Sequence, residues 1–437
     1  MSHRQKARLE ALNALVQYDQ STTSMKTLLR EMQTTSADSF DSLILAKSLS
    51  LSVIRFRNTI DFILAKSLGK KKFQALSARE QNILRIAIFE TRWLQTDVKE
   101  SLSSYPEIEA DHFKELKRAM TFDLENAIER MPVVNCLSLK HSHPSFLVKT
   151  LLDNISVEES IELMQRNNQN RTYYARVNKL YDDHEFVLDK LENVKLRSDP
   201  DVTEIFEILD GIDSIVKSQS FKDGRILIQD KASVLTVNSL NPQPGEKIWD
   251  ACAAPGMKTQ LIVEKMHGRG KVVASDVYAD RVKTARKLST HLNATNIEWI
   301  HADASNPQVH DADKILIDAP CTSTGILQAY PSFKWRLNKE TLFALMTVQN
   351  KILDAILAAY TDRPGTEIVF STCSILPHEG ESQIDSALQM HNVELLTPID
   401  YGSLGYPRFK CSKRVRRLFP HKHETSGFFI ARLRIKQ

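Results

Sequence analysis

One segment sets the architecture of this chain, Lys247-Ile248-Trp249-Asp250-Ala251-Cys252-Ala253-Ala254-Pro255-Gly256-Met257-Lys258-Thr259. A short apolar run ends in an acid, small residues follow, and a helical pattern begins directly after them. This order predicts a strand, a tight turn and a helix, the arrangement with which open α/β sheets hold nucleotide-like ligands at the carboxyl ends of their strands. The turn lacks a complete G-x-G-x-x-G pattern and a G-K-[ST] phosphate loop, so a dinucleotide or a triphosphate is poorly supported.

Strand and helix patterns alternate from about residue 226 onward, which predicts a parallel sheet with helices on both faces. We expect strands at 247–250, 271–276, 297–302, 314–318 and 367–371, and helices at 258–266, 279–291 and 339–360. A last apolar run, at 427–433, suits an added antiparallel strand. The range 226–437 is therefore predicted to be an α/β, Rossmann-like domain.

Residues 1–135 are predicted to form an all-α domain, because apolar residues recur there at helical spacing. The clearest stripe follows Ser77 and Glu80, which have the spacing of a helix-capping box. Lys70-Lys71-Lys72 lies before it in an expected loop, either as a solvated turn or as a contact for RNA phosphates. Residues 136–225 read as a small α+β linker domain that we expect to contact RNA, with helices from Pro144, at 157–167 and at 186–191 and a strand at 172–178.

The apolar content of 42% and the charged content of 26% are typical of a globular protein. A length of 437 residues predicts two or three domains. No segment has about eighteen uninterrupted apolar residues, so a transmembrane helix is not expected. The five cysteines form no C-x-x-C pair, which supports neither a disulfide framework nor a zinc site of known spacing. We expect a cytoplasmic monomer without a metal, and the net charge of +4 permits a nucleic acid as partner without requiring one.

An acid follows each of four successive predicted strands, at Asp250, Asp276, Asp303 and Asp318. A carboxylate after the second strand of such a sheet accepts hydrogen bonds from ribose hydroxyls, and Asp276 fits that role. Asp303 fits a hydrogen bond to the exocyclic amine of an adenine. Each acid alone is better explained as a helix N-cap, but the set at successive strand ends favours a binding site.

Cys321 and Cys373 also follow predicted strands, in Asp318-Ala319-Pro320-Cys321 and in Ser371-Thr372-Cys373-Ser374. A cysteine is most often a small buried apolar residue, and the other three cysteines are assigned that role. Cys321 and Cys373 differ because each lies among small or hydroxyl residues beside the predicted ligand turn. A thiolate that adds to carbon 6 of a pyrimidine makes carbon 5 nucleophilic enough to attack a sulfonium methyl. Asp318 suits the protonation of N3 that accompanies this addition.

Two further segments carry residues suited to RNA. The basic stretch 408–422 has seven lysine and arginine residues and no acid, and Tyr406, Phe409 and Phe419 are interleaved with it. Backbone neutralisation and base stacking use this combination, although a solvated loop can have the same composition. The second segment, close after Cys321, either lines the target-base pocket or covers the sheet; it is Tyr330-Pro331-Ser332-Phe333-Lys334-Trp335-Arg336.

Together these motifs resemble those of the RNA (cytosine-5) methyltransferases, over most of the chain. The family's cofactor motif is matched by 250–259, its first cysteine motif by Asp318-Ala319-Pro320-Cys321-Thr322-Ser323-Thr324-Gly325, and its second by Thr372-Cys373-Ser374-Ile375-Leu376-Pro377. Segments 229–233 and 427–431 are similar to the flanking motifs. Segment 75–85 resembles the NusB-like RNA-binding domain of the bacterial 16S ribosomal RNA methyltransferase B branch, which His143-Pro144 and Asn167-Asn168 also fit.

The resemblance implies an S-adenosylmethionine-dependent enzyme in which Cys373 is the nucleophile and Cys321 assists product release, with Asp318 as a third catalytic residue. The residues expected to hold the donor are Cys252, Ala253, Ala254, Pro255, Gly256, Met257, Lys258, Asp276, Arg281, Asp303 and Asp318. Two positions depart from the family's pattern. Met257 stands where a second glycine is usual, and His378-Glu379-Gly380-Glu381 replaces a more acidic stretch that contains Asn.

The leading hypothesis is formation of 5-methylcytosine in structured RNA, with ribosomal RNA favoured by the NusB-like resemblance. The same chemistry on transfer RNA is the first alternative, because the catalytic motifs do not separate the two substrates. A non-catalytic RNA-binding or ribosome-assembly factor is the second, and the presence of both cysteines and all the strand-end acids argues against it. A dehydrogenase is disfavoured by the missing glycine fingerprint.

Overall fold

The computed structural model describes residues 2–35, 40–105, 110–182 and 184–437, and the chain divides into two compact units. The helical unit comprises residues 1–169 and 327–337, and the sheet unit comprises residues 170–326 and 338–437. This division differs from the three ranges expected from the sequence. Residues 136–169 pack with the N-terminal helices and residues 170–225 with the C-terminal sheet, so the expected linker domain is shared between the units.

The helical unit is all-α in its described residues, as predicted. The capping box of α6 is present: Ser77 Oγ accepts from Glu80 N–H at 3.2 Å, and Glu80 Oε2 accepts from Ser77 N–H at 2.7 Å. The loop expected at Lys70-Lys71-Lys72 is wrong. These residues form the first turn of α5, after Gly69. The helices are α1 (His3–Gln20), α2 (Met25–Thr35), α3 (Phe40–Arg55), α4 (Arg57–Leu68), α5 (Lys70–Ala75), α6 (Ala78–Trp93), α7 (Val98–Leu102), α8 (Ala110–Met120), α9 (Leu124–Ile128), α10 (Val133–Lys140), α11 (Ser145–Leu152) and α12 (Val157–Asn167).

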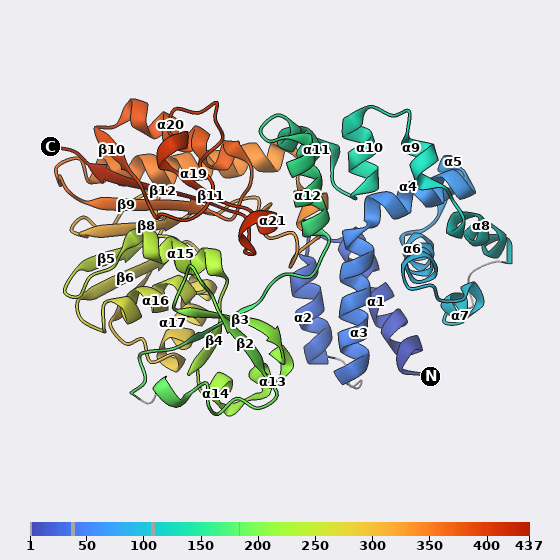
Figure 1. Cartoon of the computed structure of the whole chain (residues 1–437), viewed down its shortest axis with the longest axis horizontal. Coiled ribbons are helices and arrows are strands. Elements are labelled where there is room, and N and C mark those ends of the chain that lie inside the picture. The colour runs from blue at the N-terminus through green and yellow to red at the C-terminus, as the bar shows by residue number, and fades with distance from the viewer. Residues whose placement is uncertain (1, 36–39, 106–109, 183) are drawn as a thin grey trace. The chain divides into compact units, whose positions relative to one another are not determined.

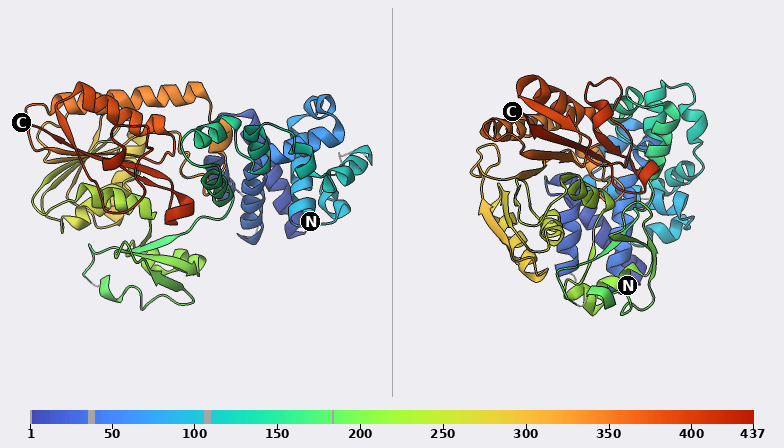
Figure 2. Two further views of the ribbon diagram at one scale, coloured as in Figure 1. Left: turned by 45° about the horizontal axis from the view of Figure 1, so that its top comes forward. Right: turned by 60° about the vertical axis from the view of Figure 1, so that its left-hand side comes forward.

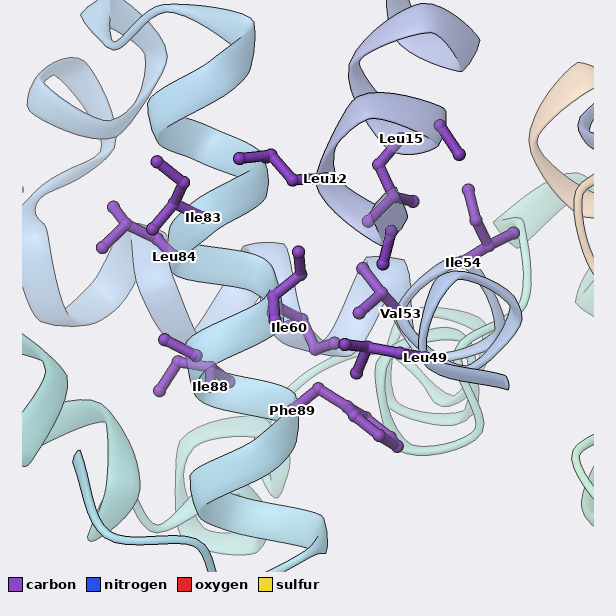
Figure 3. Close-up of a cluster of buried hydrophobic side chains, with 14 of the residues drawn as sticks. Leu12, Leu15, Leu49, Val53, Ile54, Ile60, Ile83, Leu84, Ile88 and Phe89 are labelled. Atoms are coloured by element: carbon purple, nitrogen blue, oxygen red, sulfur yellow. The ribbon is translucent and has the colours of Figure 1, made fainter. Parts of the chain in front are cut away.

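The core of the helical unit is formed where α1, α3, α4 and α6 meet (Figure 3). Apolar residues at helical spacing place one stripe of each helix in this core. Burial of one leucine-sized side chain stabilises by about 1.5–3 kcal/mol, so packing of the stripes holds the unit together. The side chains that meet include Leu12, Leu15, Leu49, Val53, Ile54, Ile60, Ile83, Leu84, Ile88 and Phe89.

Residues 327–337 leave the C-terminal part of the sequence and complete the helical unit. They include α18 (Phe333–Arg336), in which Lys334 is fully buried. Lys334 Nζ donates to the carbonyl oxygens of Arg55 and Ser142, at 3.3 and 3.0 Å, and to Asn168 Oδ1 at 2.6 Å. Two of these partners, Ser142 and Asn168, adjoin or belong to the His143-Pro144 and Asn167-Asn168 motifs, so both motifs lie near this one buried side chain.

The inserted segment meets the carboxyl ends of helices. Lys334 and Trp335 donate to carbonyls at the end of α3, the latter to Ile54 O at 2.7 Å, and Arg336 donates to carbonyls that follow α1. Such carbonyls have no partner within their own helix and carry partial negative charge, so donors and cations stabilise them there. Neither interpretation of segment 330–336 anticipated that it completes the helical unit.

The small sheet of the sheet unit is antiparallel, with strand order β2-β3-β1-β4. The helix expected at 186–191 is wrong. The short turn η1 (His184–Phe186) and irregular turns form instead, with Phe186 exposed and Val187 buried in the core of the small sheet. The elements are β1 (Tyr174–Val177), β2 (Lys195–Ser198), β3 (Ile205–Asp210), β4 (Ile226–Ile228), α13 (Ile212–Lys217) and α14 (Gln219–Lys222).

The large sheet has strand order β10-β12-β9-β8-β5-β6-β7, with β11 paired to β12 (Figure 1). Strands β5 to β9 run parallel and β12 is antiparallel to β9, as predicted. The chain continues from β5 to one side and returns to the other, so the ends of β5 and β8 flank the switch point where such sheets bind ligands. The strands are β5 (Lys247–Asp250), β6 (Lys271–Asp276), β7 (Ile297–His301), β8 (Lys314–Asp318), β9 (Glu367–Thr372), β10 (Val393–Leu396), β11 (Arg416–Leu418) and β12 (Phe428–Ile435).

Helices cover both faces of the large sheet (Figures 1 and 2). Helices α15 and α16 pack with Ile248 and Leu316 on one face, and α19 and α20 pack with Trp249 and Phe370 on the other. Successive strand residues point to opposite faces, which explains why β8 and β9 are apolar over consecutive positions. The helices are α15 (Lys231–Leu240), α16 (Met257–Lys265), α17 (Ala279–His291), α19 (Lys339–Ala359), α20 (Glu381–Met390) and α21 (Pro420–His423), with short turns η2 (Pro377–Glu379) and η3 (Ser412–Arg414).

Helix α19 alone among the described helices has the length and composition to cross a membrane. Its residues Ile352, Leu353, Ile356 and Leu357 are buried in the core formed with the large sheet. A core helix of this length has the same composition, so we assign α19 to the core of the sheet unit.

A buried ion pair connects the small sheet to α16, the helix that follows the first strand of the large sheet. Arg176 on β1 is buried, and its Nη1 lies 2.5 Å from Glu264 Oε2 on α16. Its Nε donates to Gln229 Oε1 at 2.8 Å, and Gln229 Nε2 donates to Met257 O at 3.3 Å. The network therefore reaches from the small sheet to the first residue of α16.

We predict that Arg176→Ala lowers the free energy of unfolding of the sheet unit by about 3–5 kcal/mol, because it leaves the Glu264 carboxylate buried without its cation. The matched control is Arg197→Ala on β2 of the same sheet, where the ion pair with Glu207 involves an arginine side chain that is 59% exposed. That variant is expected to show no measurable change. Urea unfolding followed by hydrogen exchange of α16 measures both, and equal effects would contradict the prediction.

Candidate active site

The turn after β5 lets a ligand approach the backbone closely. Gly256 precedes α16 with φ +103°, and a Cβ atom there would lie 3.3 Å from the Trp299 ring. Ala253 and Ala254 are buried beside the same ring. The first N–H groups of a helix have no partner within it, so this turn offers donors and small side chains together.

Asp250 ends β5 and is buried in the centre of the site. Its Oδ2 accepts from Thr259 Oγ1 at 2.7 Å, whereas Oδ1 has no hydrogen-bond partner among the described residues. Burial raises the pKa of Asp250 to about 7, although the bond from Thr259 opposes the shift. Burial likewise raises the pKa of Cys252 in the same turn, so this cysteine stays a thiol.

Asp276 ends β6, and Asp303 lies two residues after the end of β7, close to the expected positions. Asp276 Oδ2 accepts from Ala254 N–H at 3.3 Å and lies 3.2 Å from Arg281 Nη1, so the turn and α17 are joined through this carboxylate. Asp303 is exposed and accepts from Ser305 N–H at 2.9 Å. None of the strand-end acids is the N-cap of a helix in the described part of the chain, because α16 begins after Gly256, α17 after Tyr278 and α19 after Asn338.

Asp318 ends β8 and connects the turn after β5 to the two cysteines. Its Oδ2 accepts from Lys258 Nζ at 2.7 Å, and its Oδ1 accepts from Ser371 Oγ on β9 at 2.8 Å. Although burial opposes the charge, the neighbouring Asp318 carboxylate raises the pKa of Lys258. An ion pair therefore stands between the acids of the turn and the loops that follow β8 and β9.

The two predicted cysteines are brought together. Cys321 Sγ and Cys373 Sγ lie 3.2 Å apart, although 52 positions separate them in the chain. Both are free thiols and both are half-buried. Cys373 Sγ also lies 3.5 Å from Ser323 Oγ. The ends of adjacent parallel strands thus form a dithiol beside the Lys258–Asp318 pair.

The geometry makes the two sulfurs unequal. The hydrogen bond from Cys321 lowers the pKa of Cys373, and this effect prevails over burial and the nearby Asp318 carboxylate. The same hydrogen bond, together with burial, raises the pKa of Cys321 well above its ordinary value. Cys373 is therefore the sulfur that ionises first. This direction agrees with the nucleophile implied by the resemblance, and the role itself stays a prediction.

Glu379 is a site residue that sequence reasoning missed. It is fully buried, and it accepts from Thr322 N–H at 2.9 Å, from Thr322 Oγ1 at 2.5 Å and from Gln349 Nε2 at 3.0 Å. The carboxylate thereby holds the residue after Cys321. The available signal was an acid six positions after Cys373 in a stretch that departs from the family's pattern, but nothing in the sequence pairs it with Thr322.

The basic stretch 408–422 does not serve the role that its composition indicated over its full length. Tyr406, Phe419 and Arg417 are buried, so the two rings are not available for base stacking. The exposed basic residues of the stretch are Arg408, Lys410, Lys413, Arg414 and Lys422. All three residues of β11 are buried where this strand pairs with β12. The composition of the stretch could not indicate this, because the pairing partner lies outside it.

The site fits a donor without a pyrophosphate. The unpaired Asp250 Oδ1, the buried Asp276 carboxylate and the space at Gly256 offer acceptors and close approach for a ligand that carries hydroxyls and a positive charge. Met257 is half-buried at the first position of α16, and its carbonyl is held by Gln229. Within the described ranges, no cluster of His, Cys, Asp or Glu is suited to a metal ion.

Two family models match the chain. One is described as 16S rRNA methyltransferase RsmB/F and matches residues 237–434, and the other is described as the NusB family and matches residues 5–119. Ribosomal RNA small subunit methyltransferase B of Vibrio vulnificus is 33% identical over 307 residues, which cover 68% of this chain and 67% of that protein.

Two further comparisons concern a human relative and a solved structure. The human 28S rRNA (cytosine(4447)-C(5))-methyltransferase is 30% identical over 315 residues, 68% of this chain, and the match spans 38% of its own length. Among solved structures, a methyltransferase homolog protein from Pyrococcus horikoshii is 28% identical with a TM-score of 0.61, covering 70% of this chain and 99% of that one.

We predict that Asp250 makes the ligand-free sheet unit less stable as pH rises. Its pKa is raised above the unfolded value of about 3.9, so its contribution is fully present below about pH 4 and is lost as pH approaches 7. Relative to Asp250→Asn, the free energy of unfolding should fall by about 1.4 kcal/mol per pH unit across this window. Urea unfolding at a series of pH values measures the difference, with the exposed Asp303→Asn as control for charge removal. A difference that is constant with pH would contradict the raised pKa.

Proposed function

This chain belongs to the 16S rRNA methyltransferase RsmB/F family, and we propose that it forms 5-methylcytosine in small-subunit ribosomal RNA through a covalent bond to Cys373. The observation that carries the proposal is the pair of sulfurs 3.2 Å apart at the ends of β8 and β9, beside a turn fitted to a donor. The methyl donor that we assign is S-adenosylmethionine, and the proposed site of action is the cytoplasm.

The donor is assigned to the turn 252–258 and the strand-end acids. Asp276 would accept from the ribose hydroxyls, Asp303 from the adenine amine, and Asp250 Oδ1 from a group that approaches the centre of the turn. Arg281 holds Asp276 and the carbonyl of Ala254 in place. When bound, the donor supplies an electrophilic methyl group on a positively charged sulfur.

Cys373 begins the reaction as a thiolate, because its proton is the first of the pair to leave. The thiolate adds to carbon 6 of the cytosine. N3 takes a proton from Asp318, and the proton reaches Asp318 from Lys258 Nζ, which donates to this carboxylate. Carbon 5 then attacks the methyl group, and the electron pair of the carbon–sulfur bond of the donor leaves with its sulfur. A base removes the proton from carbon 5, and the Cys373–carbon 6 bond breaks with its electron pair on sulfur. N3 returns its proton to Asp318, which restores the aromatic ring.

Cys321 is assigned to the last step. Its raised pKa keeps the thiol protonated next to Cys373. As the carbon 6–sulfur bond breaks, Cys321 can give this proton to the leaving Cys373 sulfur and take it back when Cys373 ionises again. The sulfur atoms are close enough for the proton to pass directly between them. This role is distinct from nucleophilic attack and predicts opposite outcomes for the two cysteine variants.

We predict that Cys373→Ala abolishes methyl transfer while donor affinity stays near that of the wild type, because the side chain reacts with the base and not with the donor. Cys321→Ala should accumulate an RNA–protein complex that resists denaturation. Radiolabelled RNA on a denaturing gel and calorimetric donor binding measure the two effects, with Cys136→Ala as a control outside the site. Unchanged turnover in Cys373→Ala would reject it as nucleophile, and absence of the complex in Cys321→Ala would reject the release role.

The substrate is tested by methyl transfer from labelled S-adenosylmethionine to total RNA from cells that lack this protein, followed by bisulfite mapping. We expect label at a cytosine in small-subunit ribosomal RNA. Label in transfer RNA would retain the chemistry and overturn the substrate. No label, with no donor binding, would favour a non-catalytic RNA-binding factor.

A further inference from the structure

The backbone directly after Cys373 is held by a buried arginine and a buried tyrosine. Arg417 Nη1 donates to Ser374 O at 3.2 Å, Tyr406 Oη donates to Ile375 O at 2.7 Å, and Arg417 Nη2 donates to Leu376 O at 3.2 Å. Each of the three carbonyls that follow Cys373 is therefore bound by one of these two side chains. A loop with every carbonyl bound has little freedom to rotate its peptide planes.

Arg417 is itself fixed on several sides. Its Nε donates to Glu381 Oε1 at 2.7 Å and its Nη2 to Glu381 Oε2 at 2.5 Å, and both side chains are fully buried. The guanidinium carbon lies 4.2 Å from the centroid of the Tyr406 ring, and Tyr406 N–H donates to Glu381 Oε1 at 2.9 Å. Bidentate pairing and stacking use the planar guanidinium in a way that lysine cannot reproduce.

We propose that Arg417 and Tyr406 are positioning residues for Cys373: they hold the 374–376 backbone so that Sγ stays beside Cys321 and faces the substrate base. The proposal rests on the assignment of Cys373 as nucleophile. Because Glu381 neutralises the guanidinium, the effect comes from geometry and not from the charge of Arg417. A phosphate contact is incompatible with a fully buried side chain that has a bidentate carboxylate partner.

The backbone segment 374–376, which Arg417 and Tyr406 hold, also contacts the first cysteine loop. Ser374 Oγ lies 2.9 Å from Thr324 Oγ1, and Ile375 N–H donates to Thr324 Oγ1 at 3.2 Å. A shift of the 374–376 backbone would therefore move both sulfurs relative to each other. Loss of the bonds from Arg417 and Tyr406 should therefore slow the chemical step. The turn that binds the methyl donor makes none of these bonds, so its structure should not change.

The test begins with Tyr406→Phe, which removes one hydrogen bond to the loop and keeps the ring that stacks on Arg417. We expect kcat for methyl transfer and the rate of adduct formation in a Cys321→Ala background to fall about ten-fold, with KM for RNA and donor affinity unchanged. Arg417→Lys, which loses the fork to the Ser374 and Leu376 carbonyls, should fall further, by about a hundred-fold. The control is Lys351→Ala, an exposed residue of α19 outside the basic stretch and the active site, for which kcat is expected to stay at the wild-type value.

Three outcomes decide the matter. Wild-type kcat and adduct rate in Tyr406→Phe would overturn the positioning role, and this holds even when Arg417→Lys fails to fold. A rise in KM for RNA at constant kcat would instead assign Tyr406 and Arg417 to RNA binding and reject the proposal. If the Cys321→Ala parent and the wild type form no adduct at all, the proposed covalent mechanism itself fails, and the positioning role fails with it.

Discussion

The active-site loops depend on a contact that only glycine permits. Gly325 N–H donates to Cys373 O at 2.9 Å, Gly427 N–H donates to Gly325 O at 2.8 Å, and a Cβ atom on Gly325 would lie 1.8 Å from the Gly427 carbonyl oxygen. Strand order makes the contact possible. Because β12 is antiparallel to β9, its first residue lies at the edge where the parallel strands β8 and β9 end. Both cysteine loops and the start of β12 are thereby joined through backbone, and the sulfur separation follows from that joining.

The three acids at the switch point are held nearly neutral before a ligand binds, two by paired cations and one by burial. Asp250, Asp276 and Asp318 end neighbouring strands, and Lys258 and Arg281 are the cations paired with two of them. Burial keeps Asp250 protonated up to about pH 7 because no cation is paired with it. This arrangement favours a positively charged ligand and disfavours a second thiolate. One negative sulfur is tolerated because Cys321 and Ser323 donate to it, so the dithiol is limited to a single nucleophile.

The sequence was sufficient for features that follow from local pattern. Apolar runs that end in an acid predicted β5, β6 and β8 with their observed bounds, and the strand-end cysteines were expected together because parallel strands share one edge. The sequence was insufficient where the position of a side chain depends on a partner distant in the chain. The interpretation of Arg417 as an RNA contact failed because its burial depends on Glu381 and on pairing of β11 with β12. The burial of Lys334 likewise depends on distant acceptors, Arg55 O and Asn168 Oδ1, which the sequence does not pair with it.

The inserted segment has a further consequence for how the chain is connected. The first cysteine loop ends at Gly325 and Ile326 in the sheet unit, and the next residue, Leu327, already belongs to the helical unit. Donors on Lys334, Trp335 and Arg336 bond to carbonyl oxygens of Ser142, Ile54 and Thr23, at or near helix ends, and these bonds anchor the segment. The NusB-type helical unit and the loop that carries Cys321 are therefore covalently adjacent as well as parts of one chain.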